Sequence, residues 1–161
     1  MAAVATTRPV ITVRLARADE GPALNYHDLS SYRRYVLAHW TDWVAQQTFV
    51  FRDGHTVTTI LHRDGPFQTE RVDMAPYVDI EPHCHPHIDS LEYYLAGTAC
   101  IRIRHRQFQL RPSAASRLCL PILHNTWHSG VVGPEGLSFL SIQQWLVTPT
   151  SATQDWLGGT A

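Results

Sequence analysis

Histidine is concentrated in two short segments of this chain. One reads Pro82-His83-Cys84-His85-Pro86-His87, and the other reads His124-Asn125-Thr126-Trp127-His128. Side chains two residues apart on a strand face the same way, so His83 and His85 are expected to point into one cavity. Imidazole is a common metal ligand, and a second imidazole pair arriving from another strand would complete a site. The spacing therefore predicts that the chain binds a transition metal.

The elements that position these histidines begin with one early helix. The residues Asp28-Leu29-Ser30-Ser31 offer N-cap candidates before the segment 32–44. Apolar side chains then recur at helical spacing. They are Tyr32, Val36, Trp40, Trp43 and Val44. The pattern predicts an amphipathic helix that packs against a sheet.

From Thr48 onward the chain consists of short apolar and β-branched runs separated by turns. Asp53-Gly54 and Asp64-Gly65 stand between such runs and are typical of hairpins. An edge strand is also expected at 10–16, and the C-terminal segment 148–161 is expected to be loosely held. Many short strands after one helix predict an all-β sandwich or jelly-roll barrel, with its core at about 48–147.

Composition is consistent with one domain over residues 1–161. Of the 161 residues, 44% are hydrophobic, which is enough to enclose a core. The net charge of −1 gives no support for a nucleic-acid or membrane partner. Signal-peptide and transmembrane patterns are absent from the sequence, and a cytoplasmic protein is expected.

The order of these motifs resembles the two-motif pattern of the cupin superfamily. With His83 and His85 as its His-x-His pair, Gly97 falls on the glycine that closes the first motif. In the second motif the aligned residues are Ser113, Cys119, Pro121, His124 and His128. Several of them differ in type from the residues that the family has at these positions. The resemblance covers about 77–130. It implies a single-domain cupin, which is a double-stranded β-helix, and a homodimer.

The resemblance departs from the family at the metal-binding glutamate. That position is Ser90 here, and Glu92 stands two residues further along the same strand face. Three accounts of the metal ligands are therefore open. His83, His85 and His124 hold the metal alone, as in the three-histidine cupins of the cysteine and gentisate dioxygenase type. Alternatively, Glu92 or His87 supplies a fourth ligand, or the site has lost its metal.

Three neutral imidazoles would leave a divalent ion with its full charge and open positions for substrate and dioxygen. Imidazole suits several metals, so the sequence does not choose among them. Fe(II) is the first choice because open three-histidine sites often hold iron, with Zn, Ni or Mn as alternatives. Glu92 or His128 would move a proton. Candidate pocket residues are Tyr94, Trp127, Gln143 and Arg102, the last as an anchor for a carboxylate if it points inward.

The sequence leaves three functions open. The first is a metal-dependent enzyme acting on a small polar organic molecule, with a non-heme iron dioxygenase preferred. The second is a non-oxidative isomerase, cyclase or lyase that uses a metal and Glu92 as a base. The third is a non-catalytic cupin that binds a small ligand.

Overall fold

Strands make up most of the part of the chain that can be described. The computed structural model describes residues 26–113 and 115–159, so the edge strand expected at 10–16 lies outside the described residues. The strands are β1 (Gln47–Val50), β2 (Thr56–Asp64), β3 (Phe67–Met74), β4 (Asp79–Cys84), β5 (Ile88–Ile103), β6 (Arg106–Leu110), β7 (Cys119–Ile122), β8 (His128–Trp145) and β9 (Leu157–Gly158).

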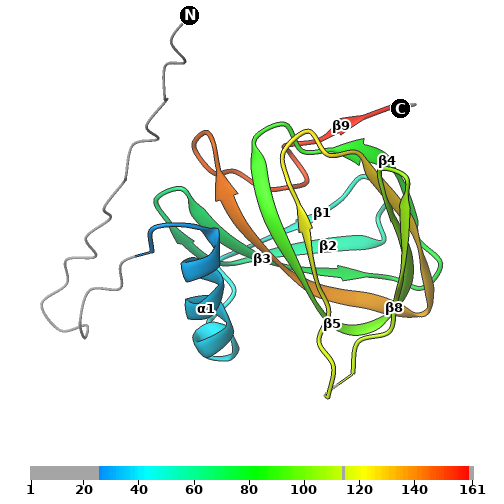
Figure 1. The fold of residues 1–161 in the computed structure, drawn as a ribbon, viewed down its shortest axis with the longest axis horizontal. Helices are drawn as coiled ribbons and strands as arrows, with labels where there is room; N and C mark the ends of the chain where they lie inside the picture. The colour runs from blue at the N-terminus through cyan, green and yellow to red at the C-terminus, as the bar shows by residue number, and fades with distance from the viewer. Residues whose placement is uncertain (1–25, 114, 160–161) are drawn as a thin grey trace, which may run out of the picture.

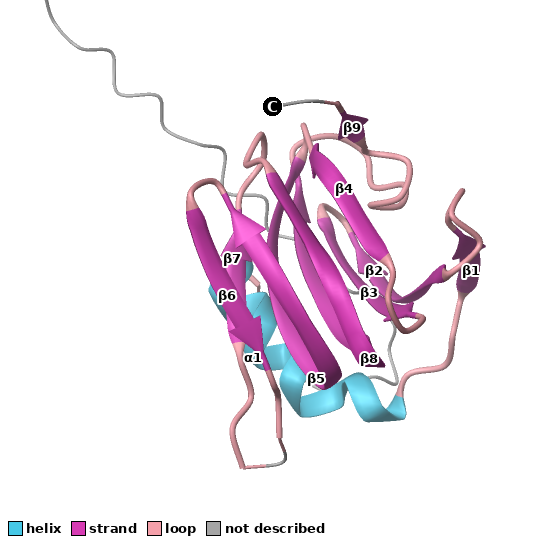
Figure 2. Ribbon diagram, turned by 90° about the vertical axis from the view of Figure 1, so that its right-hand side faces the viewer, coloured by secondary structure: helices cyan, strands magenta, loops and turns pink. Residues whose placement is uncertain are grey.

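Within the described residues these strands form one continuous antiparallel sheet that curls on itself (Figure 1). One path runs β1-β2-β3-β8-β4-β9, and β5 pairs with β6, β7 and β8. Figure 2 shows the long strands β5 and β8 side by side, with β6 and β7 beyond β5. This arrangement is the double-stranded β-helix of the cupin fold, which confirms the predicted fold class.

The β5–β8 pair bends where two glycines meet. Gly97 pairs with Leu137, next to Gly136, and the register of the pair shifts on either side of Gly97. A Cβ on Gly97 would lie 2.0 Å from the carbonyl oxygen of Gly136. Only glycine allows the two backbones to approach this closely, and its φ of 89° is also one that glycine adopts without strain. The bend lets both strands continue around the barrel.

The predicted helix is present but shorter than expected. Helix α1 (Leu29–His39) is preceded by the N-cap residue Asp28, whose side chain and that of Ser31 form a capping box. A 3₁₀ turn (Trp40–Asp42) follows the helix. Tyr32 and Val36 are fully buried against the outer face of the sheet, whereas Val44 is exposed. No helix among the described residues is long and apolar enough to cross a membrane.

Alternation along β5 separates the two faces of the barrel wall. Leu91, Tyr93 and Leu95 pack towards the cluster beneath α1. Glu92 and Tyr94 face the opposite way and line an internal cavity. A buried carboxylate is thus fixed on the inner wall by strand periodicity.

Candidate metal centre

Three histidines converge at one end of the barrel interior. His83 lies near the end of β4, His85 follows that strand, and His128 begins β8, where it pairs with His83 across the sheet. One ring nitrogen from each lies within 4.8 Å of the corresponding nitrogens of the other two. The three side chains therefore form a group of the size that a single metal ion requires.

Each of the three rings is held by a hydrogen bond to a backbone carbonyl. A carbonyl oxygen only accepts, so the Nδ1 atom of each ring carries the proton and donates it. Nε2 is then deprotonated, and its lone pair is free to bind a metal. The Nδ1···O distances are 2.7 Å from His83 to Glu81, 2.6 Å from His85 to Asp155 and 2.9 Å from His128 to Thr126.

Burial keeps these imidazoles neutral. Desolvation, reinforced by the neighbouring histidines, lowers the pKa of His83 to about 2 and that of His128 to about 4. Desolvation also lowers the pKa of His85. Metal ligation requires neutral imidazole, so protons do not compete for these rings near pH 7. Three neutral imidazoles with free Nε2 atoms fit a divalent transition metal.

The expected third ligand, His124, lies outside this group. It sits in the turn between β7 and β8, where its backbone N–H and its Nδ1 both bond to Oδ1 of Asp89, at 2.9 and 2.7 Å. His128 takes the place predicted for His124. The reason is the sheet register, which aligns His128 with His83 on β4 and with Ile103 on β5.

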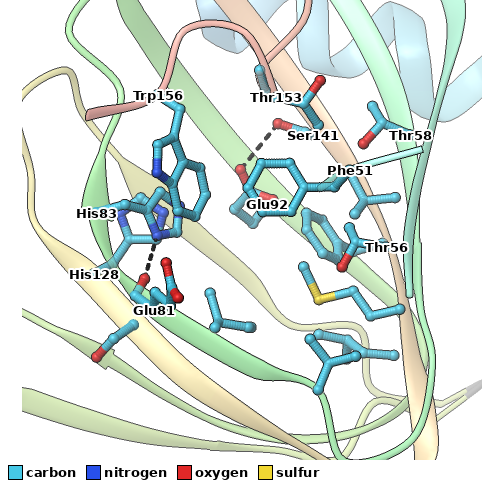
Figure 3. Close-up of a pocket in the computed structure, with 18 of the residues that line it drawn as sticks. Phe51, Thr56, Thr58, Glu81, His83, Glu92, His128, Ser141, Thr153 and Trp156 are labelled. Atoms are coloured by element: carbon cyan, nitrogen blue, oxygen red, sulfur yellow. Dashed lines mark hydrogen bonds between the residues drawn. The ribbon is translucent and has the colours of Figure 1, made fainter. Parts of the chain in front are cut away.

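The histidines form part of the wall of a cavity of about 410 Å³ inside the barrel. Figure 3 shows His83, His128 and Trp156 on one side of it and Thr56 and Thr58 on the other, with Glu92 between them. The volume lies in the range of small-molecule sites. A metal held by the three Nε2 atoms would therefore be next to a space of the size that a small molecule requires.

Glu92 is the buried acid of this cavity. Its Oε1 accepts hydrogen bonds from the hydroxyls of Ser90 (2.8 Å) and Ser141 (3.0 Å). Its Oε2 is buried and, among the described residues, has no partner. Desolvation raises the pKa of Glu92 to about 7. Such a carboxyl exchanges a proton readily at neutral pH, which is the property required of a general acid or base.

Neither residue proposed as a fourth ligand joins the histidine group. Glu92 is not among the residues that converge with His83, and His87 is exposed, with its Nδ1 2.7 Å from Asp155. The arrangement therefore corresponds to the three-imidazole account, with His128 in place of His124.

The predicted pocket residues divide into two sets. Tyr94 lines the cavity and is 2% exposed. Arg102 is exposed on β5 and does not line it, because Ile101 and Ile103 on either side of it pack with the apolar cluster inside the barrel. Trp127 does not contribute to the wall either. Gln143 is fully buried behind the wall, where it donates to Ser141 and accepts from Trp145.

Sequence reasoning missed a C-terminal segment, which we call the strap (Thr150–Trp156), that closes over the site. The carbonyl of Thr150 accepts from Gln68, and the N–H of Ala152 donates to the buried Glu70. Trp156 stacks on His83, with ring centroids 3.5 Å apart and an interplanar angle of 12°. The segment expected to be loosely held therefore contributes to the candidate metal centre, and its polar composition gave no signal of these long-range contacts.

The carboxylate of Asp155 is expected to support the metal centre through the strap. It accepts from the N–H and Nδ1 of His87, which fixes the carbonyl that orients His85. We expect Asp155→Ala to weaken Zn²⁺ binding by about 10-fold, in the range found for residues that orient metal ligands. Competition with a chromophoric chelator measures this change.

A matched control is Asp89→Ala, because Asp89 holds His124 through a bond of the same length, 2.7 Å, outside the group. That variant is expected to bind Zn²⁺ as the parent protein does. Equal losses in the two variants would contradict the role given to the strap.

Comparisons with known proteins place this chain by fold. No family model and no curated protein matches its sequence. Solved structures do match. KdgF from a Halomonas species has 14% identity and a TM-score of 0.53, with 66% of this chain and 90% of KdgF covered.

Two further solved structures agree. The Streptomyces nucleoside dehydratase Pac13 has 10% identity and a TM-score of 0.53, with 73% of this chain and 88% of that chain covered. A cupin-2 domain from Rhodospirillum rubrum has 14% identity and a TM-score of 0.53, with 74% of this chain and 75% of that chain covered. At these identities the likeness establishes the fold alone: the protein has the cupin fold.

Proposed function

We propose that this protein is a metal-dependent enzyme that moves a proton on a small carbonyl compound without an oxidant. The observation that carries the proposal is the pairing of two features in one cavity. Three neutral imidazoles present free Nε2 atoms on one wall, and Glu92, whose buried carboxyl has an unpartnered oxygen, lines another. Such a pairing suits an isomerase, a cyclase or a lyase.

Each group has a distinct task in this reaction. His83, His85 and His128 would hold the metal, which when bound supplies Lewis-acid polarisation of the carbonyl oxygen. Glu92 takes the proton from the carbon next to the carbonyl. The C–H electron pair forms a C=C bond to the carbonyl carbon, and the π pair of the carbonyl moves onto its oxygen. Ser90 and Ser141 hold Oε1 of Glu92, so Oε2 is the atom that receives the proton. Return of the proton to a neighbouring carbon gives isomerisation, and loss of a leaving group gives elimination.

The position of Glu92 favours this function over the dioxygenase preferred from sequence. A buried carboxyl with a pKa of about 7 is suited to proton transfer, and dioxygen activation does not require one. Pac13, which has the same fold, is described as a dehydratase, a non-oxidative activity, although the likeness is one of fold only.

Hydrogen exchange without dioxygen is the direct test of this function. The protein, loaded in turn with Zn²⁺, Ni²⁺, Mn²⁺ and Fe²⁺, is incubated anaerobically in D₂O with small oxo acids and hydroxy ketones. Proton NMR should detect loss of the C–H signal next to a carbonyl in the parent protein and no loss in Glu92→Gln. Turnover that requires both Fe²⁺ and dioxygen, with Glu92→Gln fully active, would contradict the proposal.

A non-heme iron dioxygenase is the second candidate, because an all-imidazole ligand set leaves the charge of Fe²⁺ uncompensated. Dioxygenase activity would be detected as oxygen consumption when the Fe²⁺-loaded protein is incubated in air with the same oxo acids and hydroxy ketones. The homodimer and the cytoplasmic location remain predictions from sequence.

A further inference from the structure

We propose that the substrate has one small chelating head and an apolar body, and that it carries no second anionic group. This inference rests on the proposed function and names the substrate class of the same site. It replaces the small polar molecule expected from sequence.

Much of the cavity wall is made from the apolar core. Side chains of the cluster inside the barrel are shared between the core and the cavity. They include Val78, Tyr94, Ile101 and Leu137, which are buried, and Met74 and Phe139, which are partly buried. Protein interiors are normally close-packed, and side chains that line a gap lose van der Waals contacts. An apolar ligand body would restore those contacts.

The apolar wall is continuous with the histidine end. On β4, Ile80 precedes His83 and pairs with Gly130, two residues after His128 on β8. Ile101 on β5 also pairs with Gly130. A molecule whose head reaches the three Nε2 atoms therefore has apolar side chains next to it along both strands.

Within residues 26–113 and 115–159, the rim offers no free cation for a second anionic group. Among the described lining residues, the histidines apart, Arg52 is the one basic side chain. It is 61% exposed, and its Nη2 already lies 2.7 Å from Oε2 of Glu81. Asp53, Asp79 and Glu92 add further carboxyl groups to the wall. A phosphate or a second carboxylate would meet like charge or lose its hydration without a partner.

A series of alkyl hydroxamates tests this inference by binding alone. Their two oxygens chelate divalent metals, and the chain length varies from acetohydroxamate to octanohydroxamate. Calorimetry with the Zn²⁺-loaded protein should show affinity rising about fourfold for each added methylene until the cavity is filled. A hydroxamate of matched length whose chain ends in a carboxylate should bind roughly 10-fold more weakly or worse.

Two matched variants test whether the dependence of affinity on chain length arises in the cavity wall. Met74→Gln places an amide in the cavity wall and should flatten the dependence on chain length while leaving acetohydroxamate affinity unchanged. Leu118→Gln alters a partly buried member of the same apolar cluster that does not line the cavity, and should keep the full dependence.

The outcomes separate the inference from the function on which it rests. Equal binding of all chain lengths, or preference for the chain with a terminal carboxylate, overturns the substrate class and leaves the metal site intact. If no hydroxamate binds to protein that carries stoichiometric Zn²⁺, the ion does not face the cavity, and the proposed function falls as well.

Discussion

Replacing His128 with alanine is expected to remove most of the bound metal, whereas replacing His124 with alanine is expected to leave it in place. His128 presents one of three converging ring nitrogens, and loss of a ligand should exceed the 10- to 100-fold effect of losing a ligand's support. We therefore expect Zn²⁺ affinity to fall by more than about 100-fold in His128→Ala. His124 bonds to Asp89 instead.

Metal analysis after gel filtration and competition with a chromophoric chelator measure both variants. His83→Ala is a positive control, because His83 belongs to the same group. Retention of Zn²⁺ by His128→Ala together with its loss from His124→Ala would restore the ligand set expected from sequence and would contradict the structure.

The second large effect concerns stability. Glu92→Gln is expected to make the metal-free protein more stable above pH 7 than the parent protein. Burial raises the pKa of the Glu92 carboxyl from 4.5 to about 7, so the folded state holds this proton more tightly than the unfolded chain does. The hydroxyls of Ser90 and Ser141 can donate to an amide oxygen as they do to the carboxylate.

The sign of the pH dependence follows from the raised pKa. Below pH 4.5 the carboxyl is protonated in both states, and its titration gives no difference in stability. As the pH rises towards 7 the unfolded chain loses the proton first, which lowers the free energy of unfolding of the parent protein. Above pH 7 the loss is complete and amounts to about 3 kcal/mol.

Urea unfolding on both sides of pH 7 measures this difference. Glu135→Gln, which removes an exposed carboxylate, is the charge-matched control and should follow the parent protein throughout. If the free energies of unfolding of Glu92→Gln and the parent protein differed by the same amount at all pH values, Glu92 would ionise as a solvated residue does. Its role as a base would then lose its physical basis.

Local patterns predicted much of this architecture. The His83-x-His85 spacing and the Asp-Gly turns concern neighbours in sequence, and the alternation on β5 placed Glu92 on the inner wall. Each of these features depends on backbone periodicity or on the conformational preference of one residue. They were therefore accessible before the structure was known.

The features that sequence missed depend on pairing between distant segments. The register of β8 against β4 places His128 next to His83, and a hydrogen bond to Asp89 holds His124 away from them. These two contacts determine which histidine joins the group. The strap depends on bonds from Thr150 and Ala152 to strand β3, far away in sequence. No local pattern in the sequence reports such pairings.

Anomalous diffraction at the zinc absorption edge, from crystals of the Zn²⁺-loaded protein, tests the metal centre most directly. The account predicts one peak at bonding distance from the Nε2 atoms of His83, His85 and His128, open to the cavity that contains Glu92. A peak between His124 and Asp89, or no peak within the barrel, would contradict it.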